Sequence, residues 1–416
     1  MSDPATLSAA PALDLDRVRA CFPALDQPTI FFENAGGSQV PRVVADAMRD
    51  YMLSTYVQLN APYEVSRRST AVVNDAHAFI NTIMNGHGIG HTILSSSSTT
   101  LCYMLADAYG RILAPGDEVV VADTAHEANR GPWLRLADRG IVLKHWHADP
   151  ATGACTMDAL DAVLTDRTRI VAFPQVSNLL GEIVDVPAIT ARVHAAGAKV
   201  VVDGVAYAPH RPIDVAAWGV DWYVYSTYKV YGPHMGALFG RDEAIDELPR
   251  PNHAFLPRDM VPYAFELGGA NHEGCAGLLA LGRYLSIVTG RDESAPADRA
   301  TVVDAFERMG AAELPLQSRL MSYLSSRDDV RIVGPGHGEA SRVATMSFRH
   351  ATRSSRSIAE SVCARGVAIR FGHMYAYALC RRMGIDTSDG VVRVSLAHYN
   401  TMDEMDRLIA VLDEVM

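Results

Sequence analysis

The sequence predicts an α/β protein with a large, mostly parallel seven-stranded sheet domain and a smaller α+β domain. Between about residues 40 and 240, helical stretches alternate with short runs rich in Val and Ile. This alternation is typical of a parallel sheet covered by helices. After residue 290 the order changes to one long helical stretch followed by short strands and helices. The length of 416 residues agrees with two to three domains of roughly 150 residues each.

Seven apolar runs are the expected strands of the larger sheet. They cover residues 91–95, 118–123, 141–146, 169–176, 199–205, 222–226 and 236–240. Functional side chains in such sheets gather just beyond the carboxyl ends of the strands. The polar residues at these ends are residues 95–100, His126, Asn178, Asp203 and residues 226–229.

The carboxy-terminal part of the chain predicts the smaller domain. A long helical pattern covers about residues 295–326, strands are expected at 330–334, 344–349, 368–371 and 391–397, and helices at 355–365 and 402–415. Loops rich in Pro and Gly at 249–262 and 268–274 precede this part. We expect a large domain of residues 30–290 and a small domain that combines residues 1–29 with 291–416.

Composition and charge exclude several classes of function. The formal net charge of −11 and the pI of about 5.7 disfavour a nucleic-acid partner, which needs a basic face. No run approaches the ~18 apolar residues of a membrane span. Residues 1–17 lack the basic and apolar regions of a secretory signal. We therefore expect a soluble, cytoplasmic protein without a nucleic-acid or membrane partner.

The cysteines, histidines and glycine-rich runs contain no metal or dinucleotide motif. The six cysteines lack C-x-x-C spacing, which favours reduced thiols over a disulfide framework or a zinc site. His145 and His147 have no carboxylate or thiol cluster at metal spacing, so we expect no metal. Neither residues 86–90 nor 334–338 combine a preceding strand with the helix and acidic residue of a dinucleotide fingerprint. A nicotinamide-dependent dehydrogenase is therefore disfavoured.

The strongest chemical signal is a pair of residues at the ends of two expected strands. Asp203 ends the run K-V-V-V-D, and Lys229 follows 26 residues later in S-T-Y-K-V-Y-G-P. A lysine amine can form a Schiff base with the aldehyde of pyridoxal phosphate (PLP), and a carboxylate can keep the pyridine nitrogen protonated. Either residue alone would be a weak signal, but the pair resembles the fold-type I PLP enzymes.

Further motifs surround this pair in a defined order. They are E-N-A-G-G-S (33–38), S-S-T-T (97–100), H-E-A-N (126–129), V-S-N-L-L-G (176–181), V-D-G (202–204), G-G-A-N-H-E-G (268–274) and V-R-V-S-L (392–396). With them the chain resembles class V aminotransferase-type enzymes over about residues 20–415. This group contains cysteine desulfurases, selenocysteine lyases and isopenicillin-epimerase-like proteins, and the cysteine desulfurase-like members are the most similar.

The resemblance implies roles for individual residues. Lys229 matches the Schiff-base lysine, Asp203 the partner of the pyridine nitrogen, and His126 the histidine that stacks on the ring and can move protons. The positions that match phosphate or other cofactor contacts are Ser98, Thr99, Thr100, Asn178, Ser226 and Gly269. The positions that match substrate contacts are Asn34, Arg370 and Arg393, of which Arg393 matches the arginine that grips a carboxylate. Without the family context each of these has a simpler structural interpretation. His126 could be a core histidine, the 97–100 run could be a helix N-cap, and Arg393 could form a structural salt bridge.

The sequence departs from the desulfurase pattern at the sulfur-accepting residue. In the motif R-x-G-H-x-C the cysteine position holds Tyr375, and tyrosine cannot accept sulfane sulfur. Cys380 lies five residues later in an expected helix and would need a shifted loop, and Cys363 is a weaker candidate. Ala206 replaces the usual Gln or His three residues after the aspartate, and Gly269 replaces a Thr that commonly reaches the neighbouring subunit's phosphate.

These departures favour a carbon–sulfur β-lyase that acts on cysteine or an S-substituted cysteine. The resemblance also implies a homodimer in which residues 268–271 help to complete the neighbouring active site. Three alternatives stay open: an aminotransferase or epimerase, a desulfurase that uses Cys380, and a PLP-binding protein without turnover.

Overall fold

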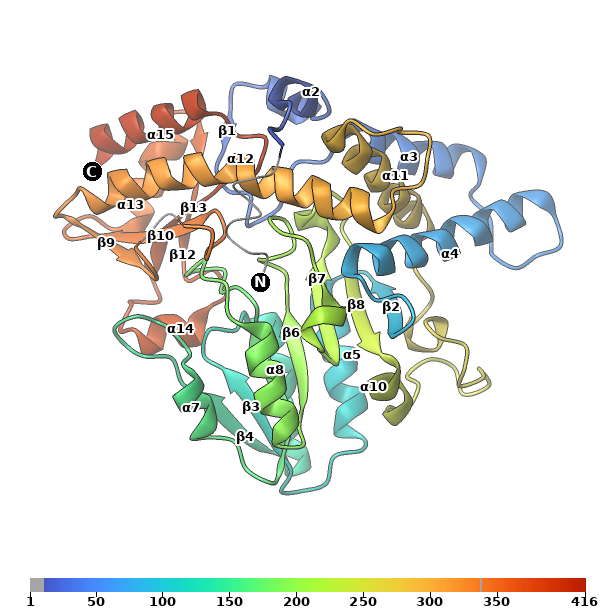
Figure 1. Cartoon of the computed structure of the whole chain (residues 1–416). Helices are drawn as coiled ribbons and strands as arrows, with labels where there is room; N and C mark the ends of the chain where they lie inside the picture. The colour runs from blue at the N-terminus through green and yellow to red at the C-terminus, as the bar shows by residue number, and fades with distance from the viewer. Residues whose placement is uncertain (1–10, 337–338) are drawn as a thin grey trace.

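A seven-stranded sheet forms the centre of the computed structural model, which describes residues 11–336 and 339–416 (Figure 1). The strand order is β2-β8-β7-β6-β5-β3-β4. The strands are β2 (Gly90–Ser95), β3 (Glu118–Ala122), β4 (Val142–Trp146), β5 (Thr168–Pro174), β6 (Lys199–Asp203), β7 (Trp222–Ser226) and β8 (Gly236–Arg241). All seven predicted strands are present, and their ends differ from the prediction by at most two residues.

β8 is the one strand that runs against the others in this sheet. The pairs β3–β4, β3–β5, β5–β6 and β6–β7 are parallel, whereas β8 is antiparallel to both β7 and β2. The predicted α/β class with a mostly parallel sheet is therefore confirmed. The short connection from β7 to β8 explains the exception, because a parallel neighbour would need a long crossover.

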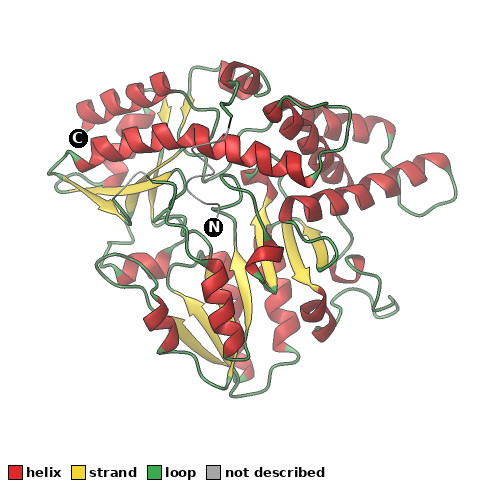
Figure 2. Ribbon diagram, viewed as in Figure 1, coloured by secondary structure: helices red, strands yellow, loops and turns green. Residues whose placement is uncertain are grey.

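Successive residues of the central strands face two different layers of helices. In β3, Val119 and Val121 pack in one core and Val120 in another, as the two-residue period of a strand requires. Helix α5 (Ser98–Gly110) covers the first face. Helices α4 (Glu64–Met84), α8 (Val186–Ala195) and α11 (His272–Thr289) cover the second. Figure 2 shows the strands enclosed between these helices. Both faces of the sheet are buried, so its strands read as continuous apolar runs.

A four-stranded sheet in the order β12-β13-β10-β9 forms the carboxy-terminal part. Its strands are β9 (Val330–Val333), β10 (Thr345–His350), β12 (Arg370–Gly372) and β13 (Val391–Ser395), and helices α13 (Ser355–Cys363) and α15 (Met402–Val415) pack on it. A separate two-stranded pair joins β1 (Ile30–Phe31) to β11 (Val367–Ala368). The chain near residue 30 therefore reaches the carboxy-terminal part.

Helix α12 (Arg299–Ser325) runs from one hydrophobic core to the other (Figure 1). Phe306 packs in the core of the large sheet, and Leu320 packs in the core of the four-stranded sheet. Pro315 lies between them inside the helix. The domain boundaries at residues 29/30 and 290/291 stay predictions. Two segments lie outside the described residues: residues 1–10, which belong to the expected small domain and to the segment without a secretory signal, and residues 337–338 of the glycine-rich run.

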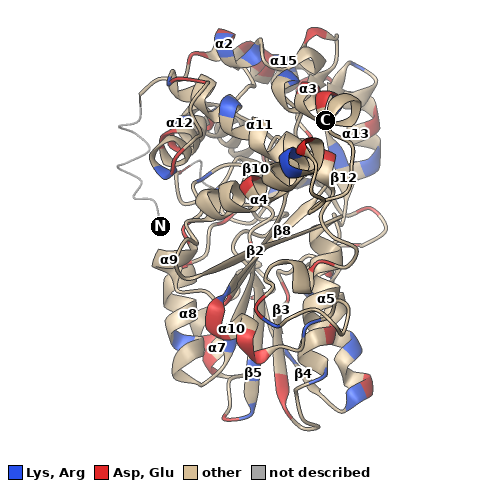
Figure 3. Cartoon of the chain, turned by 90° about the vertical axis from the view of Figure 1, so that its right-hand side faces the viewer, with Lys and Arg blue, Asp and Glu red and all other residues tan. Residues whose placement is uncertain are grey.

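The remaining helices connect these layers. They are α2 (Leu15–Arg19), α3 (Arg42–Ser54), α6 (Gly131–Leu134), α7 (Met157–Asp161), α9 (Val215–Trp218), α10 (Asp242–Glu247) and α14 (Tyr377–Arg382). Charged residues lie mostly on the outer helices and at strand ends, whereas the middle of the large sheet is uncharged (Figure 3). Among the residues that the structure describes, no helix has the length and apolar character to span a membrane.

Candidate active site

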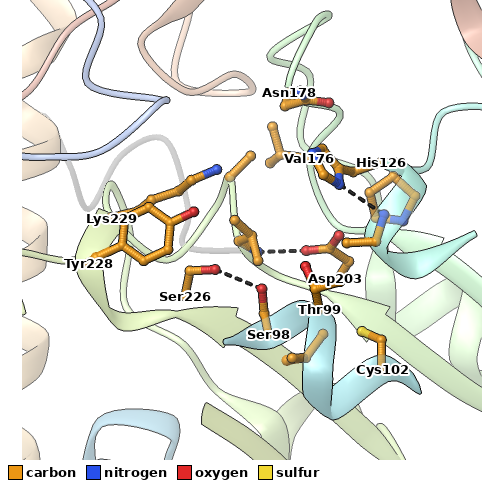
Figure 4. A pocket seen from close by; sticks show the side chains of 15 residues that line it. Ser98, Thr99, Cys102, His126, Val176, Asn178, Asp203, Ser226, Tyr228 and Lys229 are labelled. Carbon is orange, nitrogen blue, oxygen red and sulfur yellow. Dashed lines mark hydrogen bonds between the residues drawn. The ribbon is translucent and has the colours of Figure 1, made fainter. Parts of the chain in front are cut away.

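A cavity of about 550 Å³ opens at the carboxyl ends of the central strands (Figure 4). It is lined by Ser98, Thr99, Cys102, His126, Ala128, Pro174, Val176, Asn178, Asp203, Val205, Ala206, Val224, Ser226, Tyr228 and Lys229. Seven residues predicted from the sequence therefore meet in one cavity, namely Ser98, Thr99, His126, Asn178, Asp203, Ser226 and Lys229. They come together because β2, β3, β5, β6 and β7 all end at this edge of the sheet.

Lys229 lies in the 3₁₀ turn η4 (Thr227–Lys229) directly after β7. Burial and, to a smaller extent, the nearby Arg393 cation lower the pKa of its ammonium group to about 8, while the Asp203 charge acts in the opposite direction. Its Nζ lies 5.9 Å from the ring centroid of Tyr228. The amine is therefore much easier to deprotonate than an exposed lysine, which is what a nucleophilic amine requires.

Asp203 ends β6 and faces the cavity from the side opposite to Lys229 (Figure 4). Its carboxylate is 6% exposed and accepts a hydrogen bond from the backbone N–H of Val205 at 2.9 Å. Burial raises its pKa, while the Val205 hydrogen bond and the Lys229 charge act against that rise. A buried carboxylate with one hydrogen-bond donor is well suited to pair with a cationic ring nitrogen.

The N-terminus of α5 forms a polar end of the cavity. The side chains of Ser98 and Ser226 are hydrogen-bonded at 2.8 Å, and the Ser97 hydroxyl caps the helix by accepting from the Thr100 N–H at 3.1 Å. Gly236 on β8 is required here, because a Cβ at this position would collide with the backbone of Ser97 and Ser98. Free N–H groups and hydroxyls at a helix N-terminus form a site for an anion such as phosphate.

His126 follows β3 and lines the cavity with its imidazole ring. Its Nδ1 accepts a hydrogen bond from the Ala128 N–H at 3.0 Å, so the ring proton of the neutral form lies on Nε2. Burial lowers the pKa of His126 to about 4, with smaller contributions from the charges of Lys229 and Arg393. The ring is therefore neutral near pH 7 and can form a flat wall of the cavity.

The loop after β12 is fastened to the mouth of this cavity. Asn178 donates from Nδ2 to the carbonyl oxygen of Met374 at 2.7 Å, and the Glu127 N–H donates to the carbonyl of Tyr375 at 2.9 Å. The Tyr375 N–H donates to Nδ1 of His373 at 3.1 Å, and the Tyr375 ring lies 5.2 Å from that of His126. Tyr375 thus stands beside the cavity on a backbone held by several hydrogen bonds.

The predicted substrate contacts Arg393 and Arg370 lie outside the residues that line the cavity. Arg393 on β13 is 3% exposed and donates to the backbone oxygen of Asn178 at 3.3 Å. Its Nε is buried with no hydrogen-bond partner among the described residues, and burial lowers its pKa to about 10. Arg370 on β12 forms an ion pair with Glu33 at 2.6 Å. Arg393 therefore adjoins the cavity through Asn178, and its Nε remains available to donate a hydrogen bond to a ligand.

Three other predicted site residues lie elsewhere. Thr100 and Gly269 line a neighbouring cavity of about 800 Å³, and their contact with a cofactor stays a prediction. The Asn34 amide donates to two backbone carbonyls and to Asn400, and its oxygen accepts from the Tyr399 hydroxyl. This internal bonding does not support the predicted contact between Asn34 and a substrate.

Sequence reasoning missed Cys102, which lines the cavity, and named Tyr228 only as part of the polar run 226–229 without a role of its own. Cys102 lies one helical turn after Ser98 on the same face of α5, so the spacing of four residues could have revealed it. Tyr228 directly precedes Lys229. Cys102 is 2% exposed and burial raises its pKa, while Cys380 is fully buried with a pKa raised to about 11. Neither thiol has the lowered pKa of a reactive cysteine.

The chemistry of the cavity fits a phosphorylated pyridine aldehyde, and PLP is such a molecule. Lys229 offers an amine that is partly neutral near pH 8 to the aldehyde, Asp203 offers a carboxylate to the ring nitrogen, and the α5 N-terminus offers hydroxyls and N–H groups to the phosphate. The neutral His126 ring can lie against a flat heterocycle. Each group that the cofactor presents therefore has a chemically matched partner.

Comparisons with known proteins point to one family. The chain matches the family model of aminotransferase class-V over residues 30–288 and 303–408. An aminotransferase-like protein FGM3 of Gibberella zeae is 37% identical over 97% of this chain and 99% of its own length. A cysteine desulfurase of Dickeya dadantii is 32% identical over 96% of each chain.

Solved structures show the same architecture. The cysteine desulfurase CsdA of Escherichia coli is similar with a TM-score of 0.82 at 26% identity, covering 97% of this chain and 99% of its own. The apo cysteine desulfurase of Thermococcus onnurineus NA1 is similar with a TM-score of 0.85 over 97% of this chain and 98% of its own. At 23% identity the second likeness shows the fold alone.

Proposed function

Because this chain belongs to the class V aminotransferase family of PLP-dependent enzymes, we propose that it is a carbon–sulfur β-lyase for L-cysteine or an S-substituted L-cysteine. The observation that carries the proposal is Tyr375, which stands where the resemblance to desulfurases expects a sulfur-accepting cysteine. A lyase needs no protein thiol, because the sulfur leaves with the rest of the substrate's side chain.

The other cysteines support this choice over a desulfurase. Cys102 lines the cavity, but it is buried with a raised pKa, and Cys380 is buried within α14 with a pKa of about 11. Cys363 is exposed on α13, where its thiol contacts the backbone of Ile369 rather than the cavity. A thiolate is the form that attacks sulfur, and burial disfavours it at the first two positions.

We assign the cofactor contacts to the residues that fit it chemically. Lys229 is the residue that binds the aldehyde, Asp203 binds the ring nitrogen, and Ser98, Thr99 and Ser226 at the start of α5 and the end of β7 hold the phosphate. When bound, PLP supplies an electron-poor ring that stabilises negative charge at the Cα of the substrate. Asp203 supports this, because its negative charge favours a protonated ring nitrogen.

Lys229 is the residue to which we assign the Cα proton. A group with a pKa near 8 is partly neutral at mildly alkaline pH, so Nζ can accept a proton from the Cα of the substrate. The Cα–H electron pair then forms a Cα–Cβ double bond as the Cβ–S bond breaks, and the sulfur leaves as a thiolate. Addition of one water gives pyruvate and ammonium, so the reaction balances without an oxidant or reductant.

Arg393 is the group we assign to the substrate carboxylate. Arg393 uses one hydrogen bond to the Asn178 backbone, and its Nε has no partner among the described residues. The Oδ1 of Asn178 is also buried without a partner there, and as an acceptor it suits an N–H or O–H group of a ligand rather than a carboxylate. A guanidinium with free donors binds a carboxylate in a two-point geometry, which fixes the orientation of the bonds around Cα.

We also propose that the enzyme is a homodimer. Several large apolar side chains are exposed, including Leu53 (79%), Phe255 (81%) and Leu267 (61%), and Leu267 lines the second cavity. Clusters of such residues mark protein interfaces. Light scattering on the purified protein tests this proposal, and a mass of one chain would contradict it.

An aminotransferase is the second candidate function. It is favoured by the Gibberella zeae relative, whose name describes an aminotransferase-like protein and which is 37% identical to this chain. Both reactions begin with removal of the Cα proton, and they differ in whether the Cβ–S bond then breaks. The residues that line the cavity can serve both reactions, so only the reaction products distinguish a β-lyase from an aminotransferase.

The experiment that tests the proposed function is product analysis. The PLP-loaded enzyme is incubated with L-cysteine and a panel of S-substituted L-cysteines, and pyruvate, alanine and pyridoxamine phosphate are quantified in the same samples. Pyruvate and free thiol in equal amounts are expected. Alanine would instead indicate a desulfurase, and pyridoxamine phosphate with a keto acid would indicate an aminotransferase.

The variant that tests the role of Lys229 is Lys229→Ala, which removes the amine without adding bulk. It is expected to lose both the absorbance of the lysine-bound cofactor and pyruvate formation. The matched control is Lys199→Ala, which removes a lysine that pairs with Asp221 and Glu247 away from the cavity. Pyruvate formation by the Lys229→Ala enzyme at the wild-type rate would overturn the assignment.

A further inference from the structure

Two arginines face each other across the β12–β13 pair beside the active site. Arg370 and Arg393 are direct partners in the antiparallel register, so their side chains leave the sheet on the same face. Like charges in this position repel each other unless an anion lies nearby. The pKa of Arg393 shows this effect, because burial and the Arg370 charge both lower it.

Glu33 is the anion that compensates this pair. It lies just after β1, and its Oε1 is 2.6 Å from Nη1 of Arg370. An isolated bridge between Glu33 and Ser395 fixes the Glu33 backbone next to the end of β13. Glu33 also raises the pKa of Arg393, against the effect of burial. One carboxylate therefore serves both guanidinium groups, and it bonds directly to Arg370.

The local backbone is shaped around this carboxylate. A Cβ at Gly36 would collide with Oε1 of Glu33, so the glycine makes room for the side chain to fold back. The Ser395 hydroxyl accepts from the Ala35 N–H at 2.8 Å and holds the same turn. The position of Glu33 is thus built into the turn and does not depend on the ion pair alone.

The two arginines consequently differ in what they can offer a ligand. Arg393 makes one hydrogen bond to Asn178 and has an unpartnered Nε, whereas Arg370 already holds a carboxylate. Both charges act on Lys229, so both lie near the reacting centre. A substrate with one carboxylate needs Arg393 alone, and a second acidic group would need Arg370.

We propose that Glu33 is a specificity-determining residue that occupies Arg370 and so restricts the site to amino acids with one carboxylate and an uncharged side chain. This inference rests on the proposed function, since it assigns the substrate class of the same site. It also revises the predicted role of Arg370, which acts as the partner of Glu33 and not as a substrate contact. Neutral cysteine conjugates fit the site, and cysteine sulfinate or aspartate does not.

The test measures binding of two unreactive acids to the PLP-loaded enzyme. Dissociation constants of propionate and succinate are determined by calorimetry for the wild type and for Glu33→Gln, which removes the charge and keeps the size. Propionate binding is expected to tighten less than succinate binding, because Glu33 acts on Arg393 only through its charge, whereas it is hydrogen-bonded to Arg370. Succinate binding is expected to tighten about tenfold in the variant, as one charged hydrogen bond becomes available.

Two further variants keep the test decisive. In Glu33→Gln/Arg370→Gln the tightening of succinate is expected to disappear, because the released guanidinium is gone. In Arg370→Gln alone the succinate-to-propionate ratio is expected to equal that of the wild type, because Arg370 is already occupied there. The proposal would be overturned by a succinate-to-propionate ratio that is unchanged in Glu33→Gln, or by a ratio in Arg370→Gln that differs from that of the wild type.

Turnover gives a second readout that separates this inference from the proposed function. The ratio of kcat/KM for S-carboxymethyl-L-cysteine, which carries a second carboxylate and loses its sulfur as a thiolate, to that for S-methyl-L-cysteine is expected to rise about tenfold in Glu33→Gln. If neither compound yields pyruvate in any variant, the lyase proposal fails, while the succinate titration still decides the role of Glu33. If pyruvate forms but neither ratio changes, the role of Glu33 fails and the lyase proposal stands.

Discussion

The backbone N–H of Glu127 donates a hydrogen bond to the carbonyl oxygen of Tyr375 at 2.9 Å. This bond joins the loop after β12 to the turn that carries His126. Asn178 holds the preceding residue, Met374, through its side-chain amide. The backbone at Tyr375 is therefore held by groups that do not involve the tyrosine side chain, and a substitution at this position leaves those bonds in place.

The first prediction concerns Tyr375→Cys, which restores the desulfurase motif. We expect pyruvate to stay the main product and alanine to stay a minor one. A sulfur acceptor must approach the substrate's sulfur, and the bonds from Glu127 and Asn178 hold this backbone beside the cavity mouth. The alanine-to-pyruvate ratio is measured with L-cysteine, and Tyr375→Ser serves as the control without a thiol. Alanine as the main product, with a persulfide on the introduced thiol, would contradict the expectation.

The second prediction concerns the pH dependence of cofactor capture by Lys229. Because its pKa is lowered to about 8 from the usual 10.5, the neutral amine predominates above about pH 8. The rate of PLP capture by the apo-protein is expected to rise about tenfold per pH unit well below pH 8 and to level off above it. Stopped-flow absorbance measures the rate. A rate that keeps rising to about pH 10 would show an ordinary lysine instead.

The third prediction concerns the buried residue His398. Its ring nitrogens bond to the hydroxyls of Tyr284 (2.5 Å) and Tyr231 (3.1 Å), and burial lowers its pKa to about 3. The unfolded chain binds a proton at His398 below about pH 6.5, whereas the folded chain does not until about pH 3. The free energy of unfolding is therefore expected to fall as the pH drops through this window.

His398→Gln tests this expectation, because glutamine can bond to the tyrosines and does not titrate. Thermal unfolding is followed between about pH 4 and pH 7, and the loss of Tm on acidification is expected to be smaller in the variant. The low pKa of His126 contributes in the same direction, so part of the pH dependence is expected to persist. Parallel Tm curves for the two proteins would contradict the assignment to His398.

The fourth prediction concerns Gly236→Ala on β8. The added Cβ would meet the backbone of Ser97 and Ser98, so the start of α5 must shift. We expect a loss of stability of about 1–3 kcal/mol and weaker binding of PLP. Binding of pyridoxal, which lacks the phosphate, is expected to change less. Gly336→Ala is the matched control, because among the described residues, its own chain neighbours aside, no atom lies within 4 Å of its added Cβ. An equal effect of Gly236→Ala on both ligands would argue against a phosphate site there.

The large sheet could be predicted from the sequence because its strands are buried on both faces. Runs such as Val119–Val120–Val121 are apolar at every position, and a polar or Gly residue marks each end. The direction of β8 was not predicted, because a strand's own composition does not record which way its neighbours run. The pairing of β1 with β11 was also missed, since two residues carry too little pattern.

The candidate site was predictable where a motif fixed a residue to a strand end. Asp203 ends β6, and Lys229 and His126 lie within four residues of the ends of β7 and β3, so the sheet itself brings them together. Asn34 and Arg370 depend on contacts between distant segments, and sequence alone does not show that Tyr399 and Glu33 already occupy them. Long-range pairing of side chains is the information that a linear motif lacks.

The position of β13 has a consequence for the order in which the protein is made. Among the described residues β13 comes after every other strand along the chain, yet it lies inside its sheet between β12 and β10. Chains fold from the N-terminus as they emerge from the ribosome, so the large sheet with Lys229 and Asp203 precedes Arg393. A nascent or truncated chain that ends before residue 391 would bring Lys229 and Asp203 together but would lack Arg393, to which we assign the substrate carboxylate. Such a chain would also leave the edges of β10 and β12 open to aggregation.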